Sequence, residues 1–307
     1  MKTIIVTSGQ AFTDIDALAC AVAYSELLNL EGKKSEAVLP GALNHSVTDT
    51  VKSWDFKIKT EPTDTDFVSV LVDTSHIEHF ATFAKEDSIV EIYDHHYGAE
   101  EYWNTKLKEN SHIEMIGACA TLIWEEFKKR GFADKISVAS ANLLATAIIS
   151  NTLNFGAQIT DKRDIDAIEE LKPYTNLPKE WTSIYFSDQE KSVYQNIKES
   201  IVGDTKIVKV PTLPFPIVVG QMELWDSKKC LMDNKDEIQK TLEGFNLPHW
   251  IMSLPSISEK RNYLYATNLE VQKIFSDIIG AVWKDNIGVT EKLWLRKEIR
   301  KQLYELK

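Results

Sequence analysis

The sequence has few cysteines, no long apolar run and no excess of positive charge. Its 307 residues include only three cysteines, Cys20, Cys119 and Cys230, which are far apart and lie in apolar surroundings. This pattern argues against a disulfide framework and indicates small core residues in a reducing compartment. The apolar runs are too short for a signal peptide or a membrane span, so we expect a cytoplasmic protein with no membrane partner.

Acidic residues outnumber basic ones, with 46 Asp and Glu against 35 Lys and Arg, and the net charge is −11. A protein that coats nucleic acid needs a basic surface, so a nucleic-acid partner is not expected. A small anionic ligand held by a local basic cluster is still compatible with this balance. The hydrophobic fraction of 43% is typical of a globular protein with a sizeable core.

Strand and helix patterns alternate along the first half of the chain, which predicts an α/β fold with a doubly wound, mainly parallel sheet. The expected strands are 3–7, 67–73 and 88–94, and the expected helices are 16–30, 116–132 and 136–155. From about residue 172 this pattern stops, and a second, smaller α/β unit follows. Its expected strands are 206–210, 215–224, 249–254 and 262–267, with helices near 227–242 and 268–284. We therefore expect domains over residues 1–188 and 189–307.

Acidic and histidine residues follow three of the expected strands. Asp14 and Asp16 come after the first, Asp73 ends the second, and Asp94-His95-His96 ends the third. Parallel strands bring their carboxyl ends to one edge of the sheet, where ligands gather. Asp14 or Asp16 alone would be read as a helix N-cap, and the histidine pair alone as a solvated turn. Together they predict a site for Mn²⁺, Mg²⁺ or Co²⁺, because these ions accept oxygen and imidazole ligands.

The other five histidines lack such a context and are interpreted as surface or core residues. They are His45, His76, His79, His112 and His249.

These motifs resemble those of the DHH phosphoesterase family. The segments DID (14–16), VDTS (72–75) and YDHH (93–96) are similar to its first three motifs. The closest branch carries a DHHA2-type second domain and contains manganese-dependent (family II) inorganic pyrophosphatases and cytosolic exopolyphosphatases. GACATLIWEEF and LLATAIISNTLNF look like later segments of that family, whereas the match of NIKES (196–200) and VGQMELW (219–225) in the second domain is weaker.

The resemblance implies two metal ions and their ligands. One site would use Gln10, Asp14, Asp73 and Asn151, and the other Asp16, Asp73, His95 and Asn151. Gln10 stands where pyrophosphatases have a histidine, and Asn151 stands where the family has a bridging aspartate. Neutral amides are weaker ligands than carboxylates, so the metal affinity should be lower. Exopolyphosphatases of this branch are similar in having an amide residue at the position of Gln10, whereas Asn151 fits neither branch.

The resemblance also implies substrate-binding and catalytic residues. His96 would face the phosphate as a donor or acid, and Asp73 would complete the catalytic set. Lys198 and a C-terminal basic pair would bind phosphate. Arg296-Lys297 is favoured over Arg300-Lys301, although both pairs could equally lie on the solvated side of an amphipathic helix. The apolar face of that helix would be Leu295, Ile299, Leu303 and Leu306.

The function expected from these residues is metal-dependent hydrolysis of phosphoanhydride bonds, in a cleft between two domains. One alternative is a protein of this family that has lost activity and only binds a phosphate ligand. A small-nucleotide phosphodiesterase is another alternative, and a homodimer is left open.

Overall fold

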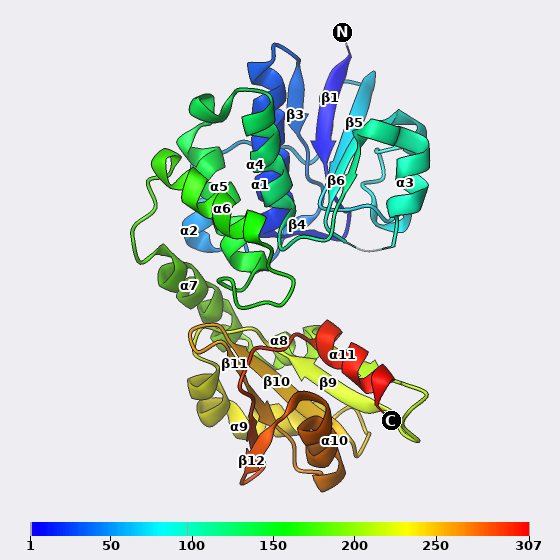
Figure 1. Ribbon diagram of the computed structural model, residues 1–307, viewed down its shortest axis with the longest axis vertical. Helices are drawn as coiled ribbons and strands as arrows, with labels where there is room; N and C mark the ends of the chain where they lie inside the picture. The colour runs from blue at the N-terminus through cyan, green and yellow to red at the C-terminus, as the bar shows by residue number, and fades with distance from the viewer. Residues whose placement is uncertain (1, 97, 307) are drawn as a thin grey trace. The chain divides into compact units, whose positions relative to one another are not determined.

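The computed structural model describes residues 2–96 and 98–306, apart from the side chain of Lys297. The chain forms two compact units, each described by itself (Figure 1). Unit 1 comprises residues 1–155 and 159–185, and unit 2 comprises residues 156–158 and 186–307. The division between residues 185 and 186 falls within helix α7 (Trp181–Gln195), as does the boundary expected from the sequence between residues 188 and 189.

Unit 1 is built around a five-stranded, wholly parallel sheet in the order β3-β1-β5-β6-β7. The strands are β1 (Thr3–Thr7), β3 (Ser35–Ala37), β5 (Phe67–Val72), β6 (Ile89–Asp94) and β7 (Ser111–Ile113), with a separate pair β2 (Phe12–Thr13) and β4 (Ala42–Leu43). The helices are α1 (Ile15–Leu30), α2 (Asp49–Lys52), α3 (Glu100–Leu107), α4 (Cys119–Lys129), α5 (Val138–Asn151) and α6 (Lys162–Leu171). Short 3₁₀ turns are η1 (Ile77–His79), η2 (Glu86–Ser88), η3 (Lys108–Asn110), η4 (Ala133–Lys135) and η5 (Lys172–Tyr174).

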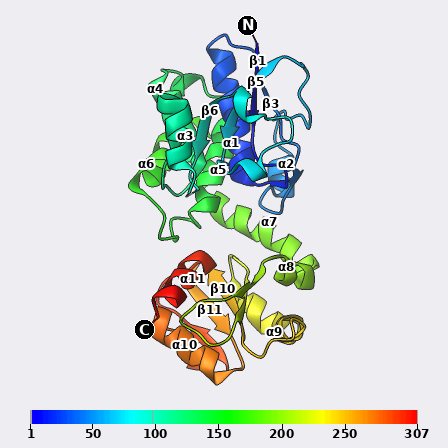
Figure 2. The ribbon, with the colours of Figure 1, turned by 90° about the vertical axis from the view of Figure 1, so that its right-hand side faces the viewer.

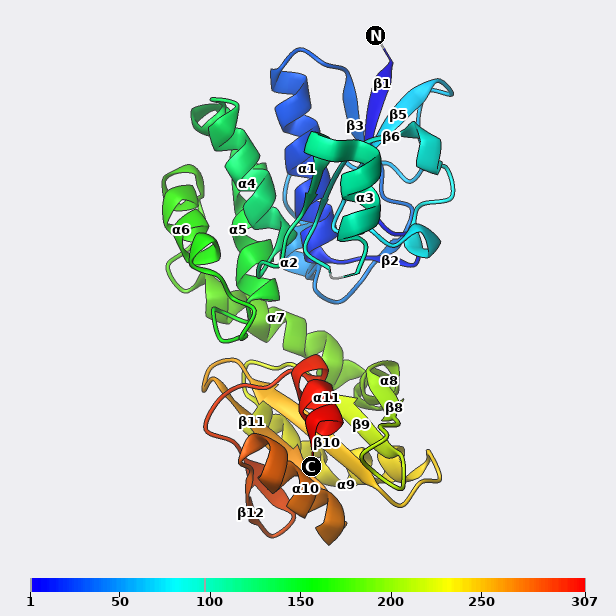
Figure 3. The same ribbon diagram turned by 45° about the vertical axis from the view of Figure 1, so that its right-hand side comes forward.

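Helices cover both faces of this sheet, so its central strands are mainly apolar. Helices α1, α4 and α5 pack together on one face, and α3 lies on the other (Figures 1 and 3). Ile5 and Val6 of β1 are fully buried, as expected for a strand enclosed on both sides. On the α3 face, Trp103 packs with Leu71 and Ile92. The predicted doubly wound, mainly parallel sheet is confirmed.

Unit 2 contains a six-stranded mixed sheet in the order β12-β13-β11-β10-β9-β8. Its strands are β8 (Thr205–Val208), β9 (Ile217–Gln221), β10 (Trp250–Ser256), β11 (Arg261–Tyr265), β12 (Val282–Lys284) and β13 (Ile287–Val289), and only the β9–β10 pairing is parallel. Helix α9 (Ser227–Glu243) covers one face, while α10 (Leu269–Ile279) and α11 (Arg296–Glu305) cover the other (Figure 2). Helix α8 (Ile197–Gly203) precedes the sheet.

The prediction of one helix over 268–284 is wrong. Helix α10 ends at Ile279, because Gly280 adopts a left-handed conformation with φ of 69° and stops the helix. The residues beyond it form β12, which pairs with β13. Across the part of the chain that the structure describes, no helix is long and apolar enough to cross a membrane.

Candidate metal centre and cavity

The acidic and histidine residues of unit 1 meet beyond the carboxyl ends of β1, β5 and β6. Asp14 is the N-cap of α1, and its carboxylate accepts the backbone N–H of Ala17 at 2.9 Å. Asp73 follows β5, and His95 and His96 follow β6. The described residues Asp73, His95 and His96 place one potential ligand atom each within 4.8 Å of one another. The expected convergence of three strand ends is therefore present.

Asp73 is held in a strained and poorly solvated position. Its φ of 56° lies in the left-handed region, which aspartate tolerates better than most residues, and its N–H donates to the carbonyl of Tyr93. Its side chain is 5% exposed, and Oδ1 has no hydrogen-bond partner among the described residues. Burial and the nearby carboxylates of Asp14 and Asp16 raise the pKa of Asp73 well above its ordinary value.

His95 faces Asp73 with a ring nitrogen that needs a cation or proton beside it. Its Nδ1 lies 3.0 Å from the carbonyl of Ile116, so this nitrogen carries the hydrogen and donates. In the neutral imidazole, Nε2 then has a lone pair, and it lies 3.3 Å from the orphaned Oδ1 of Asp73. Two lone pairs at this distance repel each other unless a positive charge lies between them.

Asp16 joins this centre and also anchors a helix. Its carboxylate accepts the backbone N–H groups of Cys119 and Ala120, both at 2.9 Å, at the start of α4. One of its oxygens lies 3.7 Å from Nε2 of His95. Burial raises the pKa of Asp16, although the imidazole of His95 and the two N–H groups oppose this. The N-cap interpretation of the DID motif thus holds for Asp14, whereas Asp16 lies in the first turn of α1 and binds N–H groups at the start of α4.

His96 is oriented by Asp94. Its Nδ1 lies 2.8 Å from Oδ1 of Asp94, which also accepts the backbone N–H groups of both histidines. Burial alone would raise the pKa of Asp94, but these bonds and the imidazole charge outweigh it and lower the pKa. Since Nδ1 is engaged, Nε2 is the nitrogen with which the half-exposed ring of His96 can reach a ligand.

The donor set fits a divalent cation. It offers an orphaned carboxylate oxygen, an imidazole lone pair fixed by its hydrogen bond to Ile116, and a further buried carboxylate from Asp16. Oxygen and imidazole ligands suit Mn²⁺ and related ions, and a backbone carbonyl that orients a ligating histidine is a common support for such sites.

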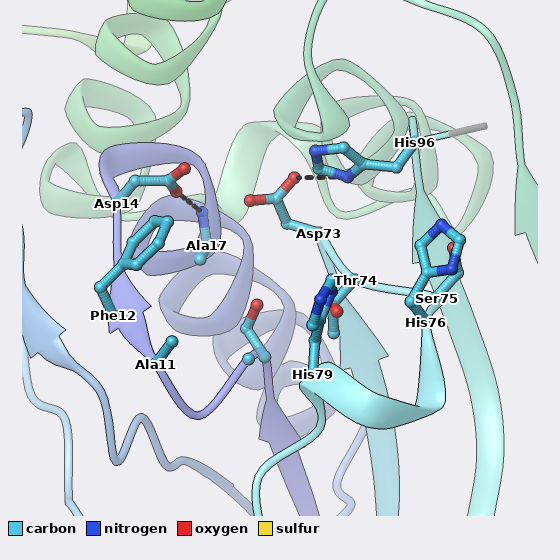
Figure 4. A pocket seen from close by; sticks show the side chains of 12 residues that line it. Ala11, Phe12, Asp14, Ala17, Asp73, Thr74, Ser75, His76, His79 and His96 are labelled. Carbon is cyan, nitrogen blue, oxygen red and sulfur yellow. Dashed lines mark hydrogen bonds and ion pairs between the residues drawn. The ribbon is translucent and has the colours of Figure 1, made fainter. Parts of the chain in front are cut away.

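A cavity of about 430 Å³ opens beside this centre (Figure 4). It is lined by Ser8, Gly9, Ala11, Phe12, Asp14, Ala17, Asp73, Thr74, Ser75, His76, His79 and His96. The interpretation of His76 and His79 as ordinary surface or core histidines missed this position. The signal that could have found them is their place in the turn directly after Asp73.

Gln10 and Asn151 do not join the described centre. The side-chain oxygen of Gln10 accepts the backbone N–H of Thr82 at 3.1 Å, and Gln10 is absent from the cavity lining. The amide nitrogen of Asn151 donates to the carbonyl of Ala147, one turn earlier in α5. Both amides thus satisfy backbone groups here, and their role as metal ligands stays a prediction.

The predicted phosphate-binding residues of the C-terminal half belong to unit 2. Lys198 is exposed on α8. Arg296 forms an ion pair with Asp204 and donates to its carbonyl at 2.6 Å, and its side chain is only 15% exposed. The side chain of Lys297 lies outside the described residues. Ile299 and Leu303 are fully buried, as predicted for the apolar face of α11.

Comparison with known proteins gives relatives along most of the chain. No protein-family profile matches it. It is 25% identical over 285 residues to a protein of Bacillus pumilus assigned as a manganese-dependent inorganic pyrophosphatase, covering 89% of this chain and 88% of the relative. It is 23% identical over 285 residues to the manganese-dependent inorganic pyrophosphatase of Bacillus subtilis, covering 88% of each chain. The resemblance to the DHHA2-containing DHH phosphoesterases is confirmed.

Solved structures have the same fold. A Methanococcus jannaschii protein assigned as a family II inorganic pyrophosphatase superposes with a TM-score of 0.64 at 19% identity, covering 99% of both chains. An exopolyphosphatase-related protein from Bacteroides fragilis gives a TM-score of 0.53 at 13% identity, covering 99% of this chain and 91% of the other. At these identities the likeness establishes the fold alone.

Proposed function

We propose that the protein is a metal-dependent hydrolase of phosphoanhydride bonds that uses Mn²⁺, with two ions in the complete site. The single observation that carries the proposal is the orphaned Oδ1 of Asp73 facing the Nε2 lone pair of His95 at 3.3 Å. The names of the relatives, which act as or are assigned as manganese-dependent pyrophosphatases, support the choice of metal and of bond.

Asp16, Asp73 and His95 would hold the first ion, and Asp14 the second together with Asp73. A bound divalent ion lowers the pKa of a water and offsets the negative charge of the phosphate. Asp73 is suited to its role because its burial leaves it poorly solvated when ionised, so a cation restores the lost stabilisation.

His96 would donate a hydrogen bond or proton to the phosphate. Asp94 accepts the hydrogen of Nδ1 and fixes the ring, so Nε2 is the nitrogen that can face the phosphate, and it carries a hydrogen to donate when the imidazole is protonated. Overall, the oxygen of one water forms a bond to phosphorus, and the bond from that phosphorus to the bridging oxygen breaks. The leaving phosphate takes the bonding electron pair, and the attacking water gives up one proton to the leaving phosphate or to the solvent.

The test is release of inorganic phosphate from pyrophosphate, tripolyphosphate and long-chain polyphosphate with Mn²⁺, Co²⁺ or Mg²⁺. We expect Mn²⁺ to support turnover, and His96→Ala to reduce kcat by about 100-fold or more while metal binding persists. Lys85→Ala, an exposed residue outside the centre, is the control. No phosphate release with any of these ions and substrates would contradict the proposal.

A second candidate, a phosphate-binding protein without turnover, is favoured by the positions of Gln10 and Asn151. Both side chains are uncharged amides that hydrogen-bond to backbone groups, so neither adds negative charge to the centre. In that case the native protein would bind phosphate but release none. The double variant Gln10→His with Asn151→Asp would then gain activity, because it supplies an imidazole and a negative charge.

A further inference from the structure

Three aromatic rings line the cavity in addition to the charged residues of the centre. Phe12, His76 and His79 all line the space that also contains Asp14, Asp73 and His96 (Figure 4). Figure 4 shows Phe12 beside Asp14 and Ala17, and the two imidazoles on the turn that follows Asp73. None of the proposed metal or proton-transfer roles uses these three rings.

Phe12 is exposed although its backbone is firmly placed. Its side chain is 57% exposed, which leaves much of an aromatic ring uncovered beside two carboxylates. Its strand β2 pairs with β4, and a Cβ on Gly41 would lie only 2.7 Å from the backbone of Phe12. Glycine at position 41 therefore permits this close approach, and the ring projects from a fixed backbone.

The two imidazoles are also placed by defined contacts. Their ring centroids are 5.8 Å apart, and the carbonyl of His79 accepts the N–H of Gln10 at 2.8 Å. A Cβ on Gly98 would touch the His76 ring at 3.5 Å. Imidazole rings can both stack on a flat group and exchange hydrogen bonds with its nitrogen and oxygen atoms.

The size of the cavity leaves room for more than a phosphate group at the metal centre. Its volume of about 430 Å³ is in the usual range for pockets that take organic ligands, about 300–1,000 Å³. Its described lining residues all belong to unit 1 and include no lysine or arginine, so basic partners for the phosphates would come from elsewhere in the chain.

We propose that the substrate is a phosphoanhydride that carries an uncharged, flat heterocycle, as a nucleoside diphosphate or triphosphate does. Its terminal phosphate lies at Asp73, His95 and His96, and its ring lies against Phe12 with His76 and His79 as hydrogen-bonding partners. This inference rests on the proposed function, because it names the substrate class of the same site. The reaction is the same water attack at the terminal phosphorus, and the leaving group is the nucleoside phosphate that keeps the bridging oxygen.

The experiment compares kcat/KM for ADP, ATP, pyrophosphate and tripolyphosphate with Mn²⁺. We expect ADP to exceed pyrophosphate, and Phe12→Ala to reduce the ADP-to-pyrophosphate ratio of kcat/KM by about 5- to 100-fold, the usual effect of losing one base–aromatic stack. The loss should be in KM, and Phe12→Tyr, which keeps a ring, should restore most of the ratio.

Because Phe12 is exposed, these variants should fold, and circular dichroism checks this. Leu269→Ala, which removes a side chain 76% exposed on α10, is the control.

The outcomes separate this inference from the proposed function. Turnover of pyrophosphate and tripolyphosphate with an unchanged ADP ratio in Phe12→Ala would overturn the ring site and leave the hydrolase intact. If no substrate is turned over, the hydrolase is overturned and binding of ADP with Mg²⁺ is measured by saturation-transfer NMR. Adenine signals that weaken in Phe12→Ala would support the ring site, and absent signals in the native protein would overturn it.

Discussion

At the scale of single residues, the carboxylates of the proposed metal centre destabilise the metal-free fold, and a bound metal ion would offset this cost. Asp73 is buried, carries a positive φ and is surrounded by two further carboxylates, each of which disfavours its ionised form. Residues of this kind persist in a fold when a ligand compensates for them. Removing the charge of Asp73 should therefore stabilise the fold of the metal-free protein or leave its stability unchanged.

Asp73→Asn tests this trade directly. Asparagine also tolerates the left-handed region, so the backbone should not change. We expect Mn²⁺ affinity to fall by more than about 100-fold, because the residue would be a direct ligand. In the metal-free state, the variant should unfold at the same temperature as the native protein or higher. Thermal scans with and without Mn²⁺ measure both effects. Mn²⁺ should raise the unfolding temperature of the native protein but not that of Asp73→Asn.

Asp87→Asn is the matched control, because its carboxylate is fully exposed. If Mn²⁺ raised the unfolding temperature of Asp73→Asn as much as that of the native protein, Asp73 would not be a ligand.

At the scale of elements, the sequence was informative where a pattern repeats and uninformative where the chain turns. Strands β1, β5 and β6 and the residues after them could be placed, because buried parallel strands have a continuous apolar signature. The places of His76 and His79 shortly after Asp73 were visible in the sequence, but the directions of their side chains could not be derived. They depend on how the turn after Asp73 leaves the sheet, and no periodicity encodes the direction of a turn. The hydrogen bond of Gln10 to Thr82 likewise joins residues far apart in the sequence.

Helices α1 and α4 and strand β6 are joined by a partly buried polar network around Arg130. Its guanidinium contacts Glu126 at 2.8 Å, Glu91 at 3.2 Å and the hydroxyl of Tyr24 at 2.6 Å. Burial alone would raise the pKa of Glu126, but Lys129 and Arg130 outweigh it and lower the pKa below 4.5. This carboxylate therefore stabilises the fold above its unfolded-state pKa, and the contribution is lost as the pH falls through the folded-state value.

Glu126→Gln should reveal this contribution. At pH 7 we expect the free energy of unfolding to decrease by about 1–3 kcal/mol, the usual range for a buried hydrogen bond to a charged group. The difference from the native protein should narrow as the pH falls below about 4.5, because Glu126 is then increasingly protonated in the unfolded state. Urea titrations at pH 7 and pH 3.5 measure it, with Glu109→Gln on the exposed turn η3 as the control. An equal difference at both pH values would show that packing, and not charge, is lost.

At the scale of the whole molecule, the chemistry is divided between two units that each have their own core. The proposed metal ligands all belong to unit 1, whereas the predicted phosphate-binding residues Lys198 and Arg296 belong to unit 2. Arg296 already has a partner within unit 2, because its guanidinium forms an ion pair with Asp204. Binding of a substrate phosphate by Arg296 therefore requires the phosphate to compete with this carboxylate.

This competition gives opposite predictions for the two partners. Arg296→Ala should raise KM for the phosphate substrate by about 10-fold or more, because a charge-assisted contact is lost. Asp204→Asn should lower KM, because the guanidinium no longer has an internal anion to satisfy. Arg300→Ala, which removes an exposed guanidinium lying 5.6 Å from the centre of the Tyr304 ring, should leave KM within about two-fold. Steady-state kinetics with Mn²⁺ measure all three.

Hydrogen exchange gives a second test. In the native protein, Mn²⁺ with a non-hydrolysable diphosphate should protect the amides at the start of α11 from exchange, whereas Mn²⁺ alone should protect amides only in unit 1. If KM rose equally in Arg296→Ala and Asp204→Asn, the pair would stabilise unit 2 and have no part in binding phosphate.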